Sequence, residues 1–414
     1  MTNIPNHYGY GLRNDEKPYA HKIPDGGNWR SLPEEERKAF MKGAFYSGGG
    51  QTTYLRKMSW DEPALTITAS VMAKATCHLH PNKPIERSEY MGDFNLTPQQ
   101  PANGLTVLEL FCGGGLGAIG FKAAGYDIVK ALDFDKNAVK AYHHNFGDHV
   151  EQADITEIDI DSLPNTDVIF GGPPCQDFSI AGKGAGADGE RGKLVWRYLE
   201  IIAAKQPKAF VFENVKGLIS KRHRPTFDAL IEKFNEIGYE ISWRVMSAWD
   251  YGVAQKRERV FIVGIRKDLG FTFEFPNPLE GDYQTRVLRD VIGDLPETIE
   301  NHHPKPLSVR VRSRMNSGGY ETYFKKHPMG QLKLPGYTIT SHYAKGAPDG
   351  LVDIKPEPRR FTVRECLRIQ SAPDNYVLPD DISLSAQYRI VGNGIASRVA
   401  WYVGRALADQ LSSN

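Results

Sequence analysis

Short apolar runs alternate with helical patterns between Leu105 and about Arg266, and this alternation limits the possible folds of the 414-residue chain most strongly. The runs predict buried strands and the intervening patterns predict helices. Alternation at this pace predicts an α/β fold with a doubly wound, mostly parallel sheet. The predicted strands are TVLEL (106–110), DIVKALD (127–133), DVIFGG (167–172), AFVFEN (209–214) and RVFIVGI (259–265), and the predicted helices cover 117–125, 136–146, 194–206 and 226–238.

The pattern changes after this region. Residues 275–360 are rich in proline, glycine, histidine and basic residues, which predicts a second, smaller and irregular domain. Regular structure returns with a predicted helix opened by Thr362, where Glu365 is placed to complete a capping box. An apolar-periodic helix is predicted over 395–411. We divide the chain into an N-terminal extension (1–103), an α/β domain (104–270), a smaller irregular domain (271–358) and a segment that returns to the α/β domain (359–414).

Composition excludes several classes of protein. Hydrophobic residues make up 40% of the chain, which permits a large core, and the net charge of +1 excludes a polybasic protein. No apolar run is long enough to span a bilayer, and the polar N-terminus is unlike a signal peptide, so we expect a cytoplasmic protein with no membrane partner. The four cysteines lie far apart, without a zinc or disulfide pattern, and we expect no metal.

Charge and internal similarity set two segments apart. Residues 301–345 contain eight lysines and arginines, interleaved with tyrosines and histidines, but one acid, Glu321. Such a stretch is either a solvated face or a nucleic-acid contact. Residues 47–70 and 317–341 share a Ser-Gly-Gly start, basic residues after a tyrosine and a Thr-Ile-Thr end. The similarity indicates either a partial duplication or chance likeness between loops rich in glycine and threonine.

Glycines and acids mark one edge of the predicted sheet as a candidate nucleoside site. In LELFCGGGLGAIGF (108–121), a strand is followed by a glycine-rich turn and a helix start, which lets the backbone approach a ligand closely. Asp133, at the end of the next strand, is placed to bind ribose hydroxyls, and Phe134 to stack on adenine. Asp154 is placed to bind an adenine amino group. The alternatives are a structural turn, a core phenylalanine and a surface aspartate.

The ends of further predicted strands carry residues suited to nucleophilic chemistry. In GGPPCQDFS (171–179), a buried strand ends in two prolines that fix the backbone and present Cys175. Glu213 ends another strand, and a partly buried carboxyl there can stay protonated and donate to a ring nitrogen. Arg257 and Arg259 stand at the start of a further strand, where they can orient a carbonyl or phosphate. Each is also a candidate for a structural salt bridge. Together they indicate a site that attacks an electron-poor ring.

The ordered set FCGGG, Asp133, Asp154, PPCQ, FENV, QKRER, RRFTVRE and GNG resembles the DNA (cytosine-5)-methyltransferases of bacterial type, over roughly residues 105–266 and 359–410. The resemblance implies that a target cytosine is flipped out of duplex DNA and that Cys175 attacks its C6. Glu213 would then interact with N3 and the amino group, and Arg259, helped by Arg257, would hold O2. The C5 carbon would take a methyl group from S-adenosylmethionine.

The resemblance also implies the remaining site residues. The segment 176–193 matches the family's catalytic lid, and 275–358 occupies the place of its target recognition domain. The residues expected at the DNA are Gln176, Ser179, Asn214 and Gln255. The residues expected at the cofactor are Phe111, Cys112, Gly113, Gly115, Asp133, Phe134, Asp154, Ile155, Pro173, Leu194, Asn393 and Gly394.

Three positions depart from the family pattern without removing a catalytic group. Leu116 stands where the family usually has a further glycine, Asp133 replaces a glutamate, and Gly394 replaces the serine of the C-terminal Asn-Ser pair. The N-terminal extension is a further departure, because its IPDGGNWRSLPEEE and RKMSWDEPALTIT stretches look like parts of a recognition domain. We hypothesise that this extension contacts DNA.

Three other functions are weighed against this one. A tRNA cytosine-5 methyltransferase would carry a Cys-Phe-Thr signature that this sequence lacks. A catalytically inactive DNA-binding regulator would have no need of Cys175, Glu213 and Arg259. A nicotinamide dehydrogenase would have no use for the PPCQ strand end. The expected partners are duplex DNA with a specific short site and a cognate restriction endonuclease, and the expected state is a monomer.

Overall fold

The computed structural model describes residues 19, 22–24, 28–41, 56–57, 78–79, 94–174, 190–293, 295, 299–326, 328–341, 343, 350–354 and 357–413. The chain forms two compact units, Met1–Asp93 and Phe94–Asn414. The site lies in the second unit.

A seven-stranded sheet organises the second unit, in the order β5-β4-β3-β6-β7-β10-β8. The first five strands in that order are parallel, and β10 runs antiparallel to both of its neighbours. The chain leaves β3 toward β4 and β5 and then returns to β6 on the other side of β3, so the topological switch point lies between β3 and β6. The strands are β3 (Thr106–Leu110), β4 (Asp127–Asp133), β5 (Val150–Gln152), β6 (Val168–Gly171), β7 (Ala209–Val215), β8 (Tyr239–Ser247) and β10 (Glu258–Arg266).

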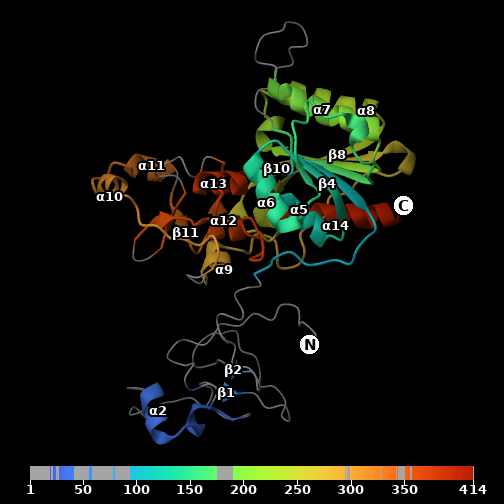
Figure 1. Cartoon of the computed structure of the whole chain (residues 1–414). Helices are drawn as coiled ribbons and strands as arrows, with labels where there is room; N and C mark the ends of the chain where they lie inside the picture. The colour runs from blue at the N-terminus through green and yellow to red at the C-terminus, as the bar shows by residue number, and fades with distance from the viewer. Residues whose placement is uncertain are drawn as a thin grey trace. The chain divides into compact units, whose positions relative to one another are not determined.

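Helices cover both faces of this sheet, since alternate strand residues point to opposite faces. Leu108 and Leu110 pack with α7 (Glu190–Lys205) and α8 (Arg224–Glu236) on one face. Val107 packs on the other face with α5 (Leu116–Ala123) and α14 (Ser397–Ser413), and α6 (Lys136–Phe146) lies beside them (Figure 1). The predicted doubly wound, mostly parallel α/β fold is confirmed.

Close approach of α5 and α14 brings the end of the chain back onto the start of the sheet. A Cβ atom at Gly120 would lie 2.4 Å from the Ser397 carbonyl oxygen and 2.5 Å from the Trp401 nitrogen, so only glycine fits there. This packing brings the residues that precede α14 close to the glycine turn before α5.

The segment between β10 and α14 forms a series of short elements, and its hydrophobic residues share one core cluster with Leu116 and Ile119 of α5 and with Ala138 and Ala141 of α6. Thr362 caps α12 and Glu365 completes the capping box, as predicted. This region joins the main body through β12, which pairs in parallel with β9 (Gln255–Lys256). Its other elements are α9 (Leu288–Ile292), α10 (Val309–Asn316), α11 (Glu321–Lys326), β11 (Gly330–Gln331), β12 (Gly336–Tyr337), β13 (Leu351–Asp353), β14 (Arg359–Arg360), α12 (Val363–Ile369) and α13 (Leu384–Asn393).

The first unit has a small core of its own. Trp29 and Phe40 are buried there, next to the short helix α2 (Glu34–Met41), and Lys22 forms an ion pair with Glu36. A two-stranded parallel ladder pairs β1 (Arg56–Lys57) with β2 (His78–Leu79). Most of the stretch that resembles 317–341 lies outside the described residues. Among the residues described in either unit, no helix has the length and apolar character needed to cross a membrane.

Candidate active site

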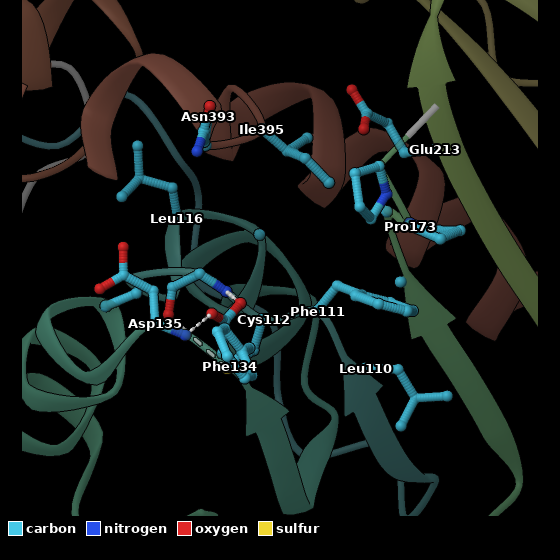
Figure 2. Close-up of a pocket in the computed structure, with 18 of the residues that line it drawn as sticks. Leu110, Phe111, Cys112, Leu116, Phe134, Asp135, Pro173, Glu213, Asn393 and Ile395 are labelled. Atoms are coloured by element: carbon cyan, nitrogen blue, oxygen red, sulfur yellow. Dashed lines mark hydrogen bonds between the residues drawn. The ribbon is translucent and has the colours of Figure 1, made fainter. Parts of the chain in front are cut away.

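A cavity of about 860 Å³ opens at the carboxyl ends of β3, β4, β6 and β7, beside the switch point of the sheet. Figure 2 shows Phe134 and Asp135 at one end of this cavity and Glu213 with Pro173 at the other. The loops that follow these strands form one side of the cavity. Asn393, the last residue of α13, lies in another part of the wall. One continuous space therefore joins the predicted cofactor end to the predicted chemical end.

The turn after β3 is shaped by backbone conformations that glycine permits. Gly113 and Gly115 have φ angles of 55° and 86°, in the left-handed region. Phe111, which also lines the cavity, has φ 57° despite its side chain. The Gly113 amide donates to Asp133 Oδ2 at 2.8 Å, and the Asp135 amide donates to Asp133 Oδ1 at 2.8 Å. Asp133 thereby holds the turn against β4, and burial raises the pKa of its carboxyl.

The predicted adenine and ribose contacts lie together at this end of the cavity. Phe134 has 71% of its surface exposed, so its ring is open to a flat ligand. Asp154 Oδ1 accepts from the Thr156 amide at 2.9 Å and from the Thr156 hydroxyl at 2.7 Å, and these bonds hold the pKa of Asp154 below its usual range. Other predicted residues in the lining are Cys112, Ile155, Pro173, Leu194, Asn393 and Gly394.

At the other end, β7 and β10 place a carboxyl beside a guanidinium. The antiparallel register pairs Phe261 with Glu213, two residues beyond Arg259. Arg259 Nε lies 3.0 Å from Glu213 Oε1, and both side chains are largely buried. Burial raises the pKa of Glu213, although Arg259 and Arg257 oppose the shift. A carboxyl with a raised pKa can hold a proton near neutral pH and donate it to a ring nitrogen.

Arg257 connects three parts of the chain at the cavity wall. Its Nη1 donates to the Ile339 carbonyl oxygen at 2.9 Å, and its Nη2 donates to the carbonyl oxygens of Gly392 at 3.0 Å and Gly394 at 2.9 Å. The side chain is 2% exposed. Arg257 therefore ties the start of β10 to the segment after β12 and to the end of α13.

These features agree with the comparisons to known proteins. The family profile of C-5 cytosine-specific DNA methylases matches residues 105–409, which include every described wall of the cavity. The chain belongs to this methylase family. It is a DNA (cytosine-5)-methyltransferase. The first 104 residues lie outside the match.

Individual relatives cover most of the methylase. Type II methyltransferase M.FnuDI of Fusobacterium nucleatum is 34% identical over 330 residues, which are 74% of this chain and 95% of that protein. Type II methyltransferase M.MthTI of Methanothermobacter thermautotrophicus is 34% identical over 327 residues, 74% of this chain and 98% of that protein. The S. pombe Dnmt2 methyltransferase structure has a TM-score of 0.59 at 19% identity, over 74% of this chain and 99% of that chain, and shares the fold.

The remaining predicted site residues differ in where the structure places them. Asn214 lines the cavity, and its Nδ2 donates to the Pro173 carbonyl oxygen at 3.0 Å, which holds the two-proline turn. Gln255 is fully buried outside the described lining, and its amide bonds the Ile339 amide and Gln370. Gly115 caps α5 and is likewise outside that lining. Cys175, Gln176, Ser179 and the stretch 175–189 lie outside the described residues.

Some residues that line the cavity of the methylase carry no recognisable sequence signal. Asp135 and Arg389 form an ion pair at 2.6 Å between the start of α6 and α13. Thr338 and Thr340, from the segment after β12, close another side. The Thr-Ile-Thr stretch was noted as an internal similarity but not as part of the site. Glu109, in the middle of a predicted strand, also lines the cavity.

Proposed function

We propose that the methylase flips a target cytosine out of duplex DNA into the cavity, activates it through Cys175 and methylates its C5 with S-adenosylmethionine as donor. The observation that carries this proposal is the continuity of one cavity, which has the Glu213–Arg259 pair at one end and Phe134 with Asp133 at the other. Chemistry that joins a base to a nucleoside cofactor needs both ends in one space.

The described residues fit S-adenosylmethionine. Phe134 offers an open ring for the adenine, and Asp133 and Asp154 offer carboxylates to the ribose and the adenine amino group. The cavity is open beside Gly113, because a Cβ atom built on this residue would meet no other atom within 4 Å. When bound, the donor supplies an electrophilic methyl group on a sulfonium sulfur.

The protein's own groups prepare the base. Burial raises the pKa of Glu213, which favours a proton on this carboxyl that it can donate to N3, and Arg259 holds O2; together they make C6 electrophilic toward the Cys175 thiolate. Cys175 follows Pro174, which lines the cavity, and Asn214 fixes the preceding Pro173. Addition at C6 leaves C5 nucleophilic, and after methylation, loss of the C5 proton and β-elimination release the cysteine.

A mechanism-based trap tests this proposal. Duplex DNA that contains 5-fluorocytosine at the target position should form a covalent complex with the wild-type protein in the presence of S-adenosylmethionine. The Cys175→Ala variant should form none. Absence of a complex in the wild type would support an inactive regulator, and labelling of tRNA in place of duplex DNA would support a tRNA enzyme.

We further propose a restriction-modification setting, a short specific site and action as a monomer. The relatives named above are Type II methyltransferases. The basic residues of 301–345 are a candidate contact with the DNA backbone, and α10 carries three exposed arginines from this set. Bisulfite sequencing of DNA from cells that express the protein should show one short methylated motif, whereas scattered methylation would contradict this proposal.

The N-terminal unit is proposed as a second DNA contact. This proposal rests on the likeness between 47–70 and 317–341. A protein without residues 1–93 is expected to fold, because the second unit has its own cores, and to bind DNA more weakly or with altered site choice. Unchanged DNA affinity and unchanged methylation pattern would refute the contact.

A further inference from the structure

A buried carboxyl that the methylation chemistry does not use lies in the wall of the cavity. Glu109 belongs to β3, is 2% exposed and contributes to the lining below the glycine turn. Its Oε2 lies 3.0 Å from the hydroxyl of Tyr142, a fully buried residue of α6. Among the residues that the structure describes, this acid is therefore hydrogen-bonded to a hydroxyl and forms no ion pair.

The same hydroxyl leads from this acid toward solvent. Tyr142 Oη lies 3.3 Å from His149 Nε2, and the two rings meet edge to face with centroids 5.5 Å apart. His149 directly precedes β5 and is partly exposed. Glu109, Tyr142 and His149 thus form an unbroken row of proton-bearing groups from the cavity to the surface.

The surrounding charges favour a neutral acid in the absence of ligand. Burial raises the pKa of Glu109 to about 8, the carboxylate of Asp133 on β4 adds to this rise, and the Tyr142 hydroxyl opposes it. Cys112, after β3, carries a thiol whose pKa is also raised by burial. Tyr376 faces Tyr142 from the segment before α13. Lys122 and Asp127 face His149, whose pKa is lowered mainly by burial, so its imidazole is available to accept a proton.

We propose that Glu109, Tyr142 and His149 are a proton-release path, through which the protein loses one proton when it binds the methyl donor and none when it binds the demethylated product. The inference rests on the proposed function, because it takes the donor to be S-adenosylmethionine. That donor carries a sulfonium charge, and S-adenosylhomocysteine lacks it. A positive charge within about 4–6 Å lowers the pKa of a carboxyl by about 1–3 units, so a sulfonium bound that close to Glu109 would move its pKa from about 8 to about 5–7 and favour its ionised form at neutral pH.

The proton transfer is balanced along the row. Protonated Glu109 donates to Tyr142 Oη while Tyr142 donates to His149 Nε2. Transfer gives the Glu109 proton to Tyr142, the Tyr142 proton to His149, and a proton from His149 to water. The hydrogen bonds then run in the reverse direction, with Tyr142 donating to the ionised carboxylate. After methyl transfer the positive charge is gone, so Glu109 takes a proton back from water along the same row and its carboxylate no longer contributes to binding of the product.

Titration calorimetry of the full-length protein tests the path. At pH 7, the heat of binding is measured in phosphate and in Tris, whose ionisation enthalpies differ, so that the difference counts protons released. We expect about 0.4–0.9 more proton released per S-adenosylmethionine than per S-adenosylhomocysteine, because a pKa of about 8 leaves most of Glu109 protonated at pH 7 and the sulfonium charge lowers that pKa by about 1–3 units. Equal proton counts for the two ligands would overturn the inference. Failure of S-adenosylmethionine to bind at all would instead overturn the proposed donor.

Matched variants assign the proton. Glu109→Gln keeps the shape and can still accept from Tyr142, so it should bind S-adenosylmethionine without the release and discriminate less between donor and product. Any proton that remains in this variant belongs to the ligand's own amino group, which titrates near pH 8. Asp148→Asn, at an exposed acid next to His149 in the sequence, should keep the wild-type count. A wild-type count in Glu109→Gln would refute the assignment.

Two measurements remain decisive if Glu109→Gln does not fold. The ratio of the wild-type affinities for S-adenosylmethionine and S-adenosylhomocysteine should rise by about two- to eightfold from pH 6.5 to pH 7.5. Tyr142→Phe should keep the proton count but slow the release, as followed with a pH indicator in stopped flow. Parallel pH profiles for the two ligands, or an unchanged release rate in Tyr142→Phe, would contradict the path.

Discussion

Two departures from the family pattern touch each other in the wall of the cofactor end. A Cβ atom built on Gly394 would lie 2.6 Å from Leu116 Cδ2, 3.0 Å from its Cβ and 3.2 Å from its Cγ. Gly394 has an ordinary extended backbone, with φ −64° and ψ 153°, so it is the neighbouring side chain and not the backbone that excludes a larger residue. We therefore predict that the leucine at 116 and the glycine at 394 compensate for each other.

The magnitude follows from packing. Gly394→Ser forces an atom into the 1% exposed leucine and should cost about 1–3 kcal/mol, the usual cost of overpacking a core. Leu116→Gly removes a buried side chain and should cost about 3–5 kcal/mol, with part of that from the cavity left behind. In the double variant the serine enters the vacated space, so the two costs should not add. We expect a coupling free energy of about 1–3 kcal/mol in favour of the pair.

Urea denaturation of the wild type, the two single variants and the double variant gives the free energies of unfolding for this cycle. Calorimetry gives the affinity of each protein for S-adenosylmethionine. The single variants should bind the donor more weakly, and the double variant should recover part of the affinity. Gly217→Ser is a matched control, because the nearest atom to its Cβ would be 3.8 Å away. Additive costs within about 0.5 kcal/mol would refute the compensation.

Three further predictions concern single residues. Glu213→Gln should reduce methyl transfer to DNA by about 10²-fold or more, since general acid catalysis contributes this much, while donor affinity measured by calorimetry stays unchanged. The free energy of unfolding of the wild type should fall, relative to that of Glu109→Gln, as pH rises from about 4.5 to about 8. Over this range Glu109 keeps its proton in the folded protein but has lost it in the unfolded chain, and urea midpoints measured across the range check the trend. Gly404→Ala should stabilise the protein by about 0.5–1 kcal/mol, because α14 gains helix propensity and the added carbon meets Ala124 and Phe121 at ordinary distances of 3.4 and 3.5 Å; unfolding by urea measures the gain.

Buried strands were predictable where apolar character was continuous. The runs 106–110 and 127–133 are the observed β3 and β4, because most of their apolar residues are buried, although Val129 of β4 is exposed. The strand β8 was missed, since its Tyr-Glu-Ile-Ser-Trp-Arg pattern belongs to a half-exposed edge strand. The antiparallel direction of β10 was also not predictable, because direction depends on pairing and not on composition. The last helix begins at Ser397, two residues after the predicted start.

Within the site, motif residues were predictable where they follow a strand directly. Asp133, Phe134 and Glu213 all line the cavity, because the carboxyl ends of neighbouring parallel strands meet at one edge. Arg389 was not predictable, since it reaches Asp135 from 254 positions away. Such partners come from the packing of α13 on α6, which no local pattern encodes. The roles of Cys175, Gln176 and Ser179 stay predictions, as these positions lie outside the described residues.

The contacts of Arg257 have an evolutionary consequence. Its guanidinium donates hydrogen bonds to the carbonyl oxygen of Ile339, in the segment after β12, and to those of Gly392 and Gly394, at the C-terminal end of α13. A carbonyl is present whatever side chain the residue carries. Side-chain substitutions in 271–358, the region proposed to contact DNA, can therefore accumulate without removing this contact with Arg257. Exchange of this region between relatives should preserve the joint, provided that the incoming backbone follows the same path beside β9.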